Sequence, residues 1–366
     1  MPRDHCSRLR LAGGTIVLAA VLLSACTAVS HDAGPPSTTT SSAPQVPAPT
    51  VRAPGALRGL AGLERSPAPE ERQRLVAAAD GLLGHQARPE RTLEVDTTDG
   101  PFVVDAQAAW TLALAGHVTG DERYRTAAAA IVDAWVSEAK DTAKACPNSG
   151  ACSTSLMVSR SAPGMVFAVD ALTLDGSYGE AELAAFHAWL RHVILPVASN
   201  RDNNWGDAGT YLKAVVGAEL GDGRILASAA KRWKQRIDLI EPDGRIPEEI
   251  RRGDASLMYS QEALDYKVAT ADVLHRTGTD VWNDKGAKGG TLEAALALVA
   301  SGLDQPKGWP GGKGDLRVPE PAGLWLMVVE RWGQGDFARL AADAAQGDGK
   351  GHSAVLWTGI THPLER

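Results

Sequence analysis

The sequence predicts an all-α protein, on the basis of three observations. Apolar residues recur every three or four positions through most of the chain after residue 66, which is the spacing of one face of an α-helix. Runs that alternate apolar and polar residues, as strands do, are nearly absent. Short turns containing Gly and Asp separate most of the periodic segments, so we expect neighbouring helices to pack as antiparallel pairs.

Residues 1–26 are expected to form a lipoprotein signal peptide. Arginines precede an apolar run at 11–23 that has the length of a signal-peptide core and is too short to span a bilayer. The run ends in Leu-Ser-Ala-Cys, which resembles a bacterial lipobox. Cys26 would then be the lipidated first residue of the mature chain. Ordinary signal cleavage nearby, with Cys26 uninvolved, is the alternative.

A disordered tether is expected over residues 27–66. Its central part, 31–54, is rich in Pro, Ser, Thr and Ala and has almost no large apolar residue, so it cannot bury enough surface to offset its ordering entropy. A lipid at Cys26 followed by this tether would hold the protein at the outer face of the bacterial cell membrane. Residues 67–366 suffice for one large domain or two smaller ones, and we assign them to one helical domain.

Eleven helices are expected in this domain. In the first and third, apolar residues follow the helical spacing, and the others continue the pattern. Thr-Gly-Asp at 119–121 indicates a helix stop followed by an N-cap, and the turns at 220–223 and 241–244 separate later helices. In chain order, the expected helices are Glu70–Gln86, Asp105–Val118, Asp121–Ala139, Leu156–Leu174, Glu180–Val197, Asn204–Leu220, Arg224–Ile240, Asp254–Arg276, Thr291–Ser301, Pro319–Trp332 and Phe337–Ala345.

Two architectures fit eleven helices with short connections. In an α/α toroid, antiparallel hairpins curve around a central cleft, and an irregular bundle is the alternative. The helical pattern does not separate the two. No fixed-period repeat is visible, so a regular solenoid is not supported.

Charge and motif content exclude several functional classes. The net charge is −7, and removal of residues 1–26, with three Arg and one Asp, leaves −9. That balance argues against a nucleic-acid binder, and an anionic polymer would need a local basic groove. Phosphate-loop, nucleophile-elbow and zinc-helix motifs are absent from the sequence, and its histidines lack ligand spacing. We therefore expect no metal and no cofactor.

Cys146 and Cys152 are expected to form a local disulfide. They are the cysteines that remain after Cys6 and Cys26 are assigned to the signal and the lipid, and they flank a turn-like Pro-Asn-Ser-Gly-Ala loop. Disulfides persist in exported proteins. Free thiols are the alternative, while two Cys without nearby His do not make a metal site.

Two polar stretches carry the functional signal. Arg252 and Tyr259 lie seven residues apart, about two helical turns, so they would share a face if the segment were helical. A guanidinium beside a phenol suits a substrate that carries a carboxylate and must lose a carbon-bound proton. Earlier in the chain, the polar run 203–207 opens another expected helix.

Two tryptophans stand in polar or loop contexts. Trp205 follows Asn204, and Trp309 lies in Gly-Trp-Pro-Gly-Gly. The flat apolar face and polar edge of Trp suit a sugar ring, and loop residues often contact ligands. Most other tryptophans lie on apolar helix stripes and are expected in the core.

These stretches resemble the alginate lyase family of helical-toroid polysaccharide lyases. The resemblance rests on Asn-Asn-Trp-Gly at 203–206 and on Arg252 and Tyr259 within 247–259, and it spans roughly residues 103–332. It implies an α/α toroid and cleavage of alginate or a related polyuronate by β-elimination. Asn204 and Arg252 would stabilise the charge that develops on the uronate carboxylate, and Tyr259 would exchange protons with C5 and O4.

Four further residues are expected to contact the anionic polysaccharide, namely Asn203, Trp205, Arg251 and Trp309. The protein is expected to act as a monomer.

One position departs from the family's pattern. The family usually has a histidine directly after the second asparagine of the motif, whereas this chain has Trp205. Three explanations stay open. Tyr259 serves as both base and acid, or His187 or His192 reaches the site in space, or the protein acts on another uronate polymer or has lost activity.

Each candidate residue also has a structural interpretation. The asparagines at 203–204 could cap a helix. The arginines at 251–252 could pair with the glutamates at 248–249 on the surface, with little effect on stability. Tyr259 could pack in a helix stripe with Tyr266.

Two other functional classes compete with the lyase. A glycoside hydrolase needs two carboxyl groups about 5 to 10 Å apart, and the available candidates are Asp207, Glu248, Glu249 and Asp254. A non-catalytic glycan-binding lipoprotein would keep the groove and lack the base.

Overall fold

The computed structural model describes residues 54–58, 60, 69–143, 153–333, 335–346 and 361. The expected signal peptide, the lipidation site Cys26 and the cysteine pair Cys146 and Cys152 lie outside these residues.

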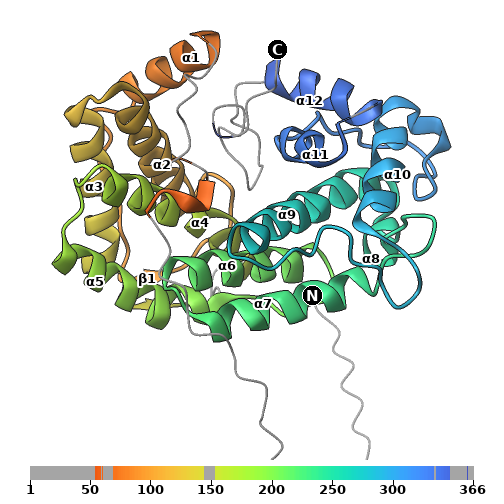
Figure 1. Cartoon of the computed structure of the whole chain (residues 1–366), viewed down its shortest axis with the longest axis horizontal. Coiled ribbons are helices and arrows are strands. Elements are labelled where there is room, and N and C mark those ends of the chain that lie inside the picture. Colours follow the sequence, from red (N-terminus) through yellow and green to blue (C-terminus); the bar gives the residue numbers. More distant parts are fainter. Residues whose placement is uncertain are drawn as a thin grey trace, which may run out of the picture. The chain divides into compact units, whose positions relative to one another are not determined.

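The described residues after 66 form an α/α toroid, so the predicted fold class is confirmed (Figure 1). Its α-helices are α1 (Pro69–Asp80), α2 (Pro101–Thr119), α3 (Glu122–Glu138), α4 (Thr154–Leu174), α5 (Glu180–Trp189), α6 (Asn204–Glu219), α7 (Gly223–Ile237), α8 (Pro247–Ile250), α9 (Ser256–Arg276), α10 (Leu292–Asp304), α11 (Leu324–Trp332) and α12 (Asp336–Gln346). Short helical turns are η1 (Ala56–Arg58), η3 (Leu190–Ile194), η4 (Leu195–Val197), η5 (Gly253–Ala255) and η6 (Pro306–Gly308).

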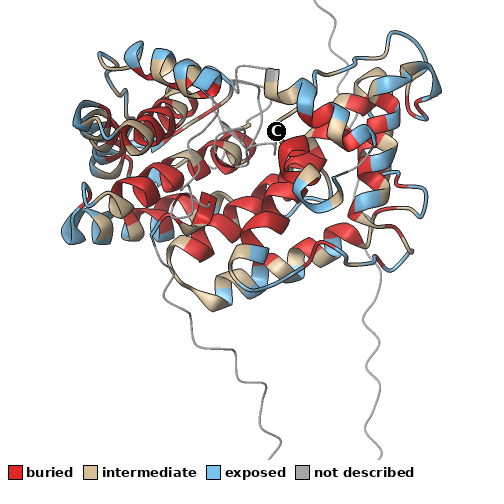
Figure 2. Cartoon of the chain, turned by 45° about the horizontal axis from the view of Figure 1, so that its top comes forward, coloured by how far each residue is buried: buried red, intermediate tan, exposed pale blue. Residues whose placement is uncertain are grey.

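The helices form an inner and an outer layer. In the inner layer, α2 packs on α4, α4 on α6, and α6 on α9. Burial separates the layers, since 16 of the 21 residues of α4 are buried but only 5 of the 17 in α3. Figure 2 shows the buried residues gathered along the central helices. None of the described helices is long and apolar enough to cross a membrane.

Capping residues set several helix ends as the sequence predicted. Asp121 precedes α3, and its side chain accepts a hydrogen bond from the Arg123 amide at 2.9 Å. Asp222 caps α7 in the same way. Gly120 ends α2 with a φ of 76°, a conformation that glycine adopts without a Cβ penalty. The stop and start predicted at 119–121 are confirmed.

Proline and helix irregularity move other boundaries. The expected helix at 180–197 is α5 followed by a π turn and a 3₁₀ turn, with Pro196 in the latter. The expected helix at 319–332 begins only at Leu324, after the prolines at 319 and 321. Proline lacks the N–H that continues a helix and disfavours helical backbone in the residue before it.

Three short elements, β1, β2 and α8, were not predicted from the sequence. Residues Thr92–Leu93 (β1) and Asp141–Thr142 (β2) form a two-stranded parallel sheet, in which Thr92 pairs with Asp141. The four-residue helix α8 precedes α9. Elements this short have too few residues for a periodic pattern.

The folded domain begins earlier than the expected boundary at residue 67. Leu57 and Leu60, which we assigned to the tether, are buried. The amides of Gly55 and Leu57 donate hydrogen bonds to the Asp170 carboxylate at 2.8 and 3.3 Å. The pair of leucines supplies the apolar surface that the Pro- and Ser-rich part of the tether lacks, so this end of the tether packs against the domain.

Gly206, near the start of α6, allows a test of how closely this helix packs against the segment at Arg201. A Cβ atom at this position would overlap the carbonyl of Arg201. We expect Gly206→Ala to lower the free energy of unfolding by about 2 to 3 kcal/mol, because backbone must move to admit the methyl group. Gly84 is the control, since a Cβ there meets nothing within 4 Å. Urea unfolding measures this loss, and equal urea midpoints for Gly206→Ala and Gly84→Ala would contradict the close packing.

Candidate active site

The asparagine pair lies where α6 begins. The Asn203 side chain caps the helix, because its Oδ1 accepts a hydrogen bond from the Trp205 amide at 3.1 Å. Asn204 is the first residue of α6 and is fully buried. The structural interpretation therefore holds for Asn203, whereas the Asn204 side chain is free of capping and makes other contacts.

A buried glutamate joins the two polar stretches. Glu249, in α8, has no exposed surface. Its Oε1 accepts a hydrogen bond from the backbone N–H of Asn204 at 2.8 Å, and its Oε2 lies 3.6 Å from Nε of Arg252. Asn204 and Arg252 thus contact the same carboxylate, although 48 positions separate them in the chain.

Arg252 and Tyr259 are in contact, but not for the reason expected. They do not share one continuous helix, because α8 ends at Ile250 and Gly253 has a φ of 60° before α9 begins at Ser256. The turn instead folds the exposed Arg252 back over the half-buried Tyr259, with the guanidinium carbon 4.7 Å from the ring centroid. This is a cation–π distance.

The side chain of Asn204 contacts a second glutamate, Glu262. The Asn204 amide nitrogen Nδ2 donates to Glu262 Oε2 at 3.1 Å. Glu262 also accepts from the Tyr266 hydroxyl at 3.1 Å and lies 3.8 Å from Arg160 of α4. We did not predict a role for Glu262 from the sequence, although it lies three residues after Tyr259, a spacing that places both on one face of α9.

Below Asn204, α6, α7 and α9 share a buried ion cluster. Asp207 accepts two hydrogen bonds from Arg236 at 2.7 and 3.0 Å, and the Lys267 ammonium lies 2.5 Å from its Oδ2. Burial alone would raise the pKa of Asp207, but Arg236 and Lys267 together hold that pKa below its ordinary value. Burial lowers the pKa of Lys267 to about 8.

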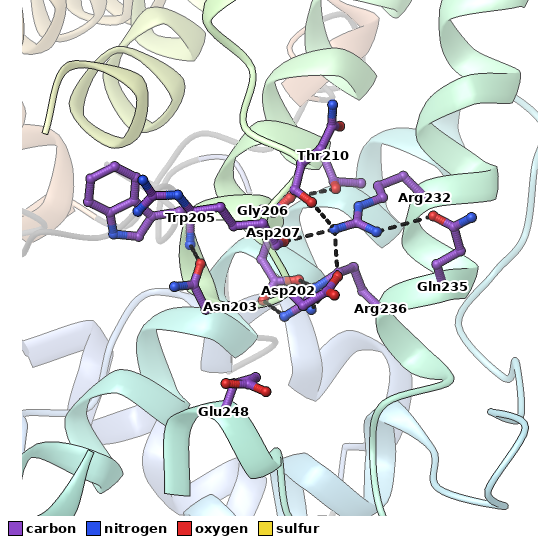
Figure 3. Close-up of polar contacts among 12 residues, drawn as sticks. Asp202, Asn203, Trp205, Gly206, Asp207, Thr210, Arg232, Gln235, Arg236 and Glu248 are labelled. Carbon is purple, nitrogen blue, oxygen red and sulfur yellow. Dashed lines mark hydrogen bonds and ion pairs between the residues drawn. The ribbon is translucent and has the colours of Figure 1, made fainter. Parts of the chain in front are cut away.

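Trp205 points away from this ion cluster. Figure 3 shows its ring on one side of the start of α6, while Asp207 faces Arg236 on the other. The ring is half-buried, and the Arg201 guanidinium carbon lies 4.3 Å from its centroid. Trp205 therefore keeps a partly open aromatic face beside a cation, which is compatible with its expected contact with the polysaccharide.

Two expected substrate contacts lie elsewhere. Trp309 is 6% exposed, and its indole N–H donates to the Ser256 hydroxyl at 2.7 Å. Its ring packs over Gly302, so the loop context at 308–312 conceals a core tryptophan and we withdraw it as a substrate contact. Arg251 is exposed and pairs with Glu248, as in the surface interpretation of the two arginines.

No described contact joins His187 or His192 to Asn204, Arg252 or Tyr259, so neither takes the place of the histidine that the family has at position 205. His187 pairs with Glu219 at 3.0 Å, at the opposite end of α6 from Asn204. Fifteen residues of helix correspond to about 22 Å. His192 is exposed and lies in the π turn after α5. Other described histidines pair with carboxylates outside the site, namely His85 with Asp105, His117 with Asp175 and His275 with Asp280.

The carboxylates that a glycoside hydrolase would use are already engaged. Asp207 is buried between two cations, and Glu248 pairs with Arg251. Asp254 accepts hydrogen bonds from the amides of Lys313 and Gly314, both at 3.0 Å, and so orders the loop before α11. Within the part of the chain that the structure describes, no group of three or more His, Cys, Asp or Glu residues is placed to hold a metal ion.

In this α/α toroid a buried glutamate contacts Asn204 and Arg252, and Arg252 contacts Tyr259. Fold and residues together are those expected of the helical-toroid polysaccharide lyases. The family model described as alginate lyase matches residues 100–309. The chain belongs to the alginate lyase family, and it is a polysaccharide lyase.

Solved structures share this fold at low sequence identity. An alginate lyase from Bacteroides ovatus is 15% identical with a TM-score of 0.65, over 86% of this chain and 99% of that chain. A variant of alginate lyase A1-III complexed with a tetrasaccharide is 16% identical with a TM-score of 0.67, over 89% and 99%. Alginate lyase A1-III from Sphingomonas species A1 is 18% identical with a TM-score of 0.55, over 72% and 88%. No curated protein matches the chain.

Proposed function

We propose that this protein cleaves alginate or a related polyuronate by β-elimination. In that reaction the C5 proton is removed, the bond from C4 to the glycosidic O4 breaks, O4 takes up a proton, and a C4–C5 double bond remains. The C5 proton is acidic only when the negative charge that develops on the uronate carboxylate is stabilised. The site must therefore provide a carboxylate-binding pair and a proton carrier.

Asn204 and Arg252 are the proposed carboxylate-binding pair. An amide nitrogen carries two hydrogens, and the contact with Glu262 uses one of those on Asn204. Asn204 is fully buried, so in this proposal neighbouring side chains move when a substrate oxygen takes the other hydrogen. The side chain of Arg252 is 36% exposed, so its guanidinium is available to a ligand. Hydrogen bonds from a charged donor to a carboxylate are among the stronger ones in proteins.

Tyr259 is the proposed proton carrier at both C5 and O4. His85, His117, His187 and His275 each pair with a carboxylate outside the site, which supports the first of the three explanations for Trp205. One group can serve both positions when the two protons lie on the same face of the sugar. The guanidinium of Arg252, 4.7 Å from the ring centroid, is placed to stabilise negative charge after Tyr259 gives up its proton.

The observation that supports this proposal is the unbroken chain of contacts from Asn204 through Glu249 and Arg252 to Tyr259. The test is incubation with polymannuronate, polyguluronate and glucuronan while the ultraviolet absorbance of the unsaturated product is followed. We expect absorbance to rise with at least one polymer. Reducing ends without that absorbance would indicate a hydrolase, and tight oligosaccharide binding without turnover would indicate a glycan-binding protein.

We also propose that the protein is exported and lipid-anchored through Cys26 at the outer face of the bacterial membrane, as a monomer with a Cys146–Cys152 disulfide. The lipobox-like end of the signal supports the anchor, and the turn-like loop between the two later cysteines supports the disulfide. Incorporation of labelled palmitate by the wild type and Cys26→Ser tests the anchor, since only the wild type should be labelled.

A further inference from the structure

Glu249 is placed to act on both members of the carboxylate-binding pair. It is buried in the short helix α8. One carboxylate oxygen accepts a hydrogen bond from the backbone N–H of Asn204 at 2.8 Å, and the other lies 3.6 Å from Nε of Arg252. The first-turn amides of a helix have no partner within it, so the contact to Asn204 holds the start of α6 against α8. The contact to Arg252 restrains a long side chain that is otherwise exposed.

The charges that act on Glu249 lie on three helices and on the turn after α8. Asp207 of α6, Arg236 of α7 and Lys267 of α9 form the ion cluster described above, and Arg252 lies on the outer side. With Glu249 ionised, the four buried groups carry two negative and two positive charges. With Glu249 protonated, the same groups carry one net positive charge facing the Arg252 guanidinium.

We infer that Glu249 is a positioning residue, which holds Asn204 and Arg252 in register for the substrate carboxylate and releases Arg252 when it is protonated. The inference rests on the proposed function, because it assumes that these two residues bind a uronate. Glu249 itself does not touch the sugar in this scheme. Its effect is transmitted through the α6 backbone and the Arg252 side chain.

The protonation step falls in an accessible pH range. Burial and the neighbouring Asp207 raise the pKa of Glu249 to about 7, against the hydrogen bond from Asn204 and the charges of Lys267 and Arg252, which lower it. Below about pH 7 the protonated form dominates, and the attraction for Arg252 is lost. We expect the loss of this restraint on Arg252 to outweigh the added positive charge, so binding of a uronate should weaken as the pH falls through this value.

The test measures binding and turnover separately. Binding of a mannuronate oligosaccharide is measured by calorimetry in Tyr259→Phe, which removes turnover, with and without Glu249→Gln, at about pH 6 and about pH 8. The glutamine keeps an oxygen for the Asn204 amide but carries no charge for Arg252. We expect Tyr259→Phe to bind roughly tenfold more weakly at the lower pH, and the double variant to bind weakly at both.

Turnover in the otherwise wild-type protein gives the second measurement. Glu249→Gln should lower kcat by roughly tenfold to a hundredfold, as expected when a catalytic group is misplaced, and should remove the acid limb of the kcat/KM profile. Glu248→Gln is the matched control, since Glu248 is part-exposed and pairs with Arg251, and it should change neither. Glu249→Asp keeps the charge with a shorter reach, so a lowered kcat in this variant would show that position matters beyond charge.

The outcomes separate the two proposals. If binding depends on pH but no unsaturated product forms, the role of Glu249 in binding is sustained and the lyase reaction is rejected. Product formation combined with binding that Glu249→Gln leaves pH-dependent would reject the role of Glu249 and sustain the lyase. Absence of binding to any uronate at either pH would overturn both. Thermal unfolding of each variant shows whether it is folded. If Glu249→Gln is not folded, the change in binding between pH 8 and pH 6 in Tyr259→Phe still tests the protonation step, and a lowered kcat in Glu249→Asp still tests the positioning role.

Discussion

Tyr259→Phe is expected to lower kcat on a susceptible polyuronate by roughly 10³- to 10⁴-fold. The substitution removes the phenolic oxygen that the mechanism uses both to take the C5 proton and to protonate O4, and general acid–base catalysis is typically worth 10²- to 10⁴-fold for one such role. KM should change little, because the ring that contacts Arg252 remains. Initial rates of unsaturated product formation measure the effect.

Tyr178→Phe is the control for this prediction. The hydroxyl of Tyr178 donates to Asp133 of α3 at 2.9 Å and takes no part in the contacts of the candidate site, so the variant should keep wild-type kcat. Product formation by Tyr259→Phe at near the wild-type rate would remove Tyr259 from the mechanism. The proton would then have to be carried by another group at the site. The carboxylate of Glu262, which is 20% exposed and contacts Asn204, would be the first to test.

Asp207→Ala should have the largest effect on stability. Asp207 is 2% exposed and holds Arg236 and Lys267 in the interior. Removal of one partner of a buried ion pair leaves an uncompensated charge and costs about 3 to 5 kcal/mol, which urea unfolding at neutral pH would measure. Asp202→Ala is the matched control, because Asp202 also lies near Arg236, at 3.7 Å, but is 66% exposed, and exposed pairs contribute about 0 to 1 kcal/mol.

The contribution of Asp207 should also depend on pH in a defined direction. Its pKa is lowered in the folded protein, so the folded state favours the ionised form. The stabilisation is fully present above the unfolded-state pKa of about 4 and is lost as the pH falls through the lower folded value. The difference in unfolding free energy between wild type and Asp207→Ala should therefore shrink only in strong acid. If this difference shrank as much between pH 8 and pH 6 as in strong acid, the lowered pKa of Asp207 would be contradicted.

Local sequence was sufficient to predict most of the helices. The stop at Gly120 and the cap at Asp121 act on backbone groups within a few residues, so a short window of sequence contains the cause. The predicted boundaries were wrong where helical periodicity does not determine the helix end, as at the π turn after Trp189. Trp309 was misassigned because its partner, Ser256, lies 53 positions earlier in the chain.

The candidate site was only partly predictable. Asn204, Arg252 and Tyr259 were identified from residue type and family resemblance, and Arg252 and Tyr259 proved to be in contact through a turn rather than along one helix. Glu249 was considered as a hydrolase carboxylate or as a surface partner of the neighbouring arginines, and its contact with Asn204 was not foreseen. Glu262 and Lys267 were missed because both lie within a helix stripe and resemble ordinary solvated charges until α6 packs against α9.

The sequence by itself determined the helical class, the caps and the residue types available for chemistry, since these depend on periodicity and on hydrogen bonds between near neighbours. Only the tertiary structure decided which of those residues meet. Burial between α6, α7 and α9 turns Asp207, Arg236 and Lys267 into one ion cluster and raises the pKa of Glu249. Those effects come from desolvation and from charges distant in the chain, and neither is encoded in a local pattern.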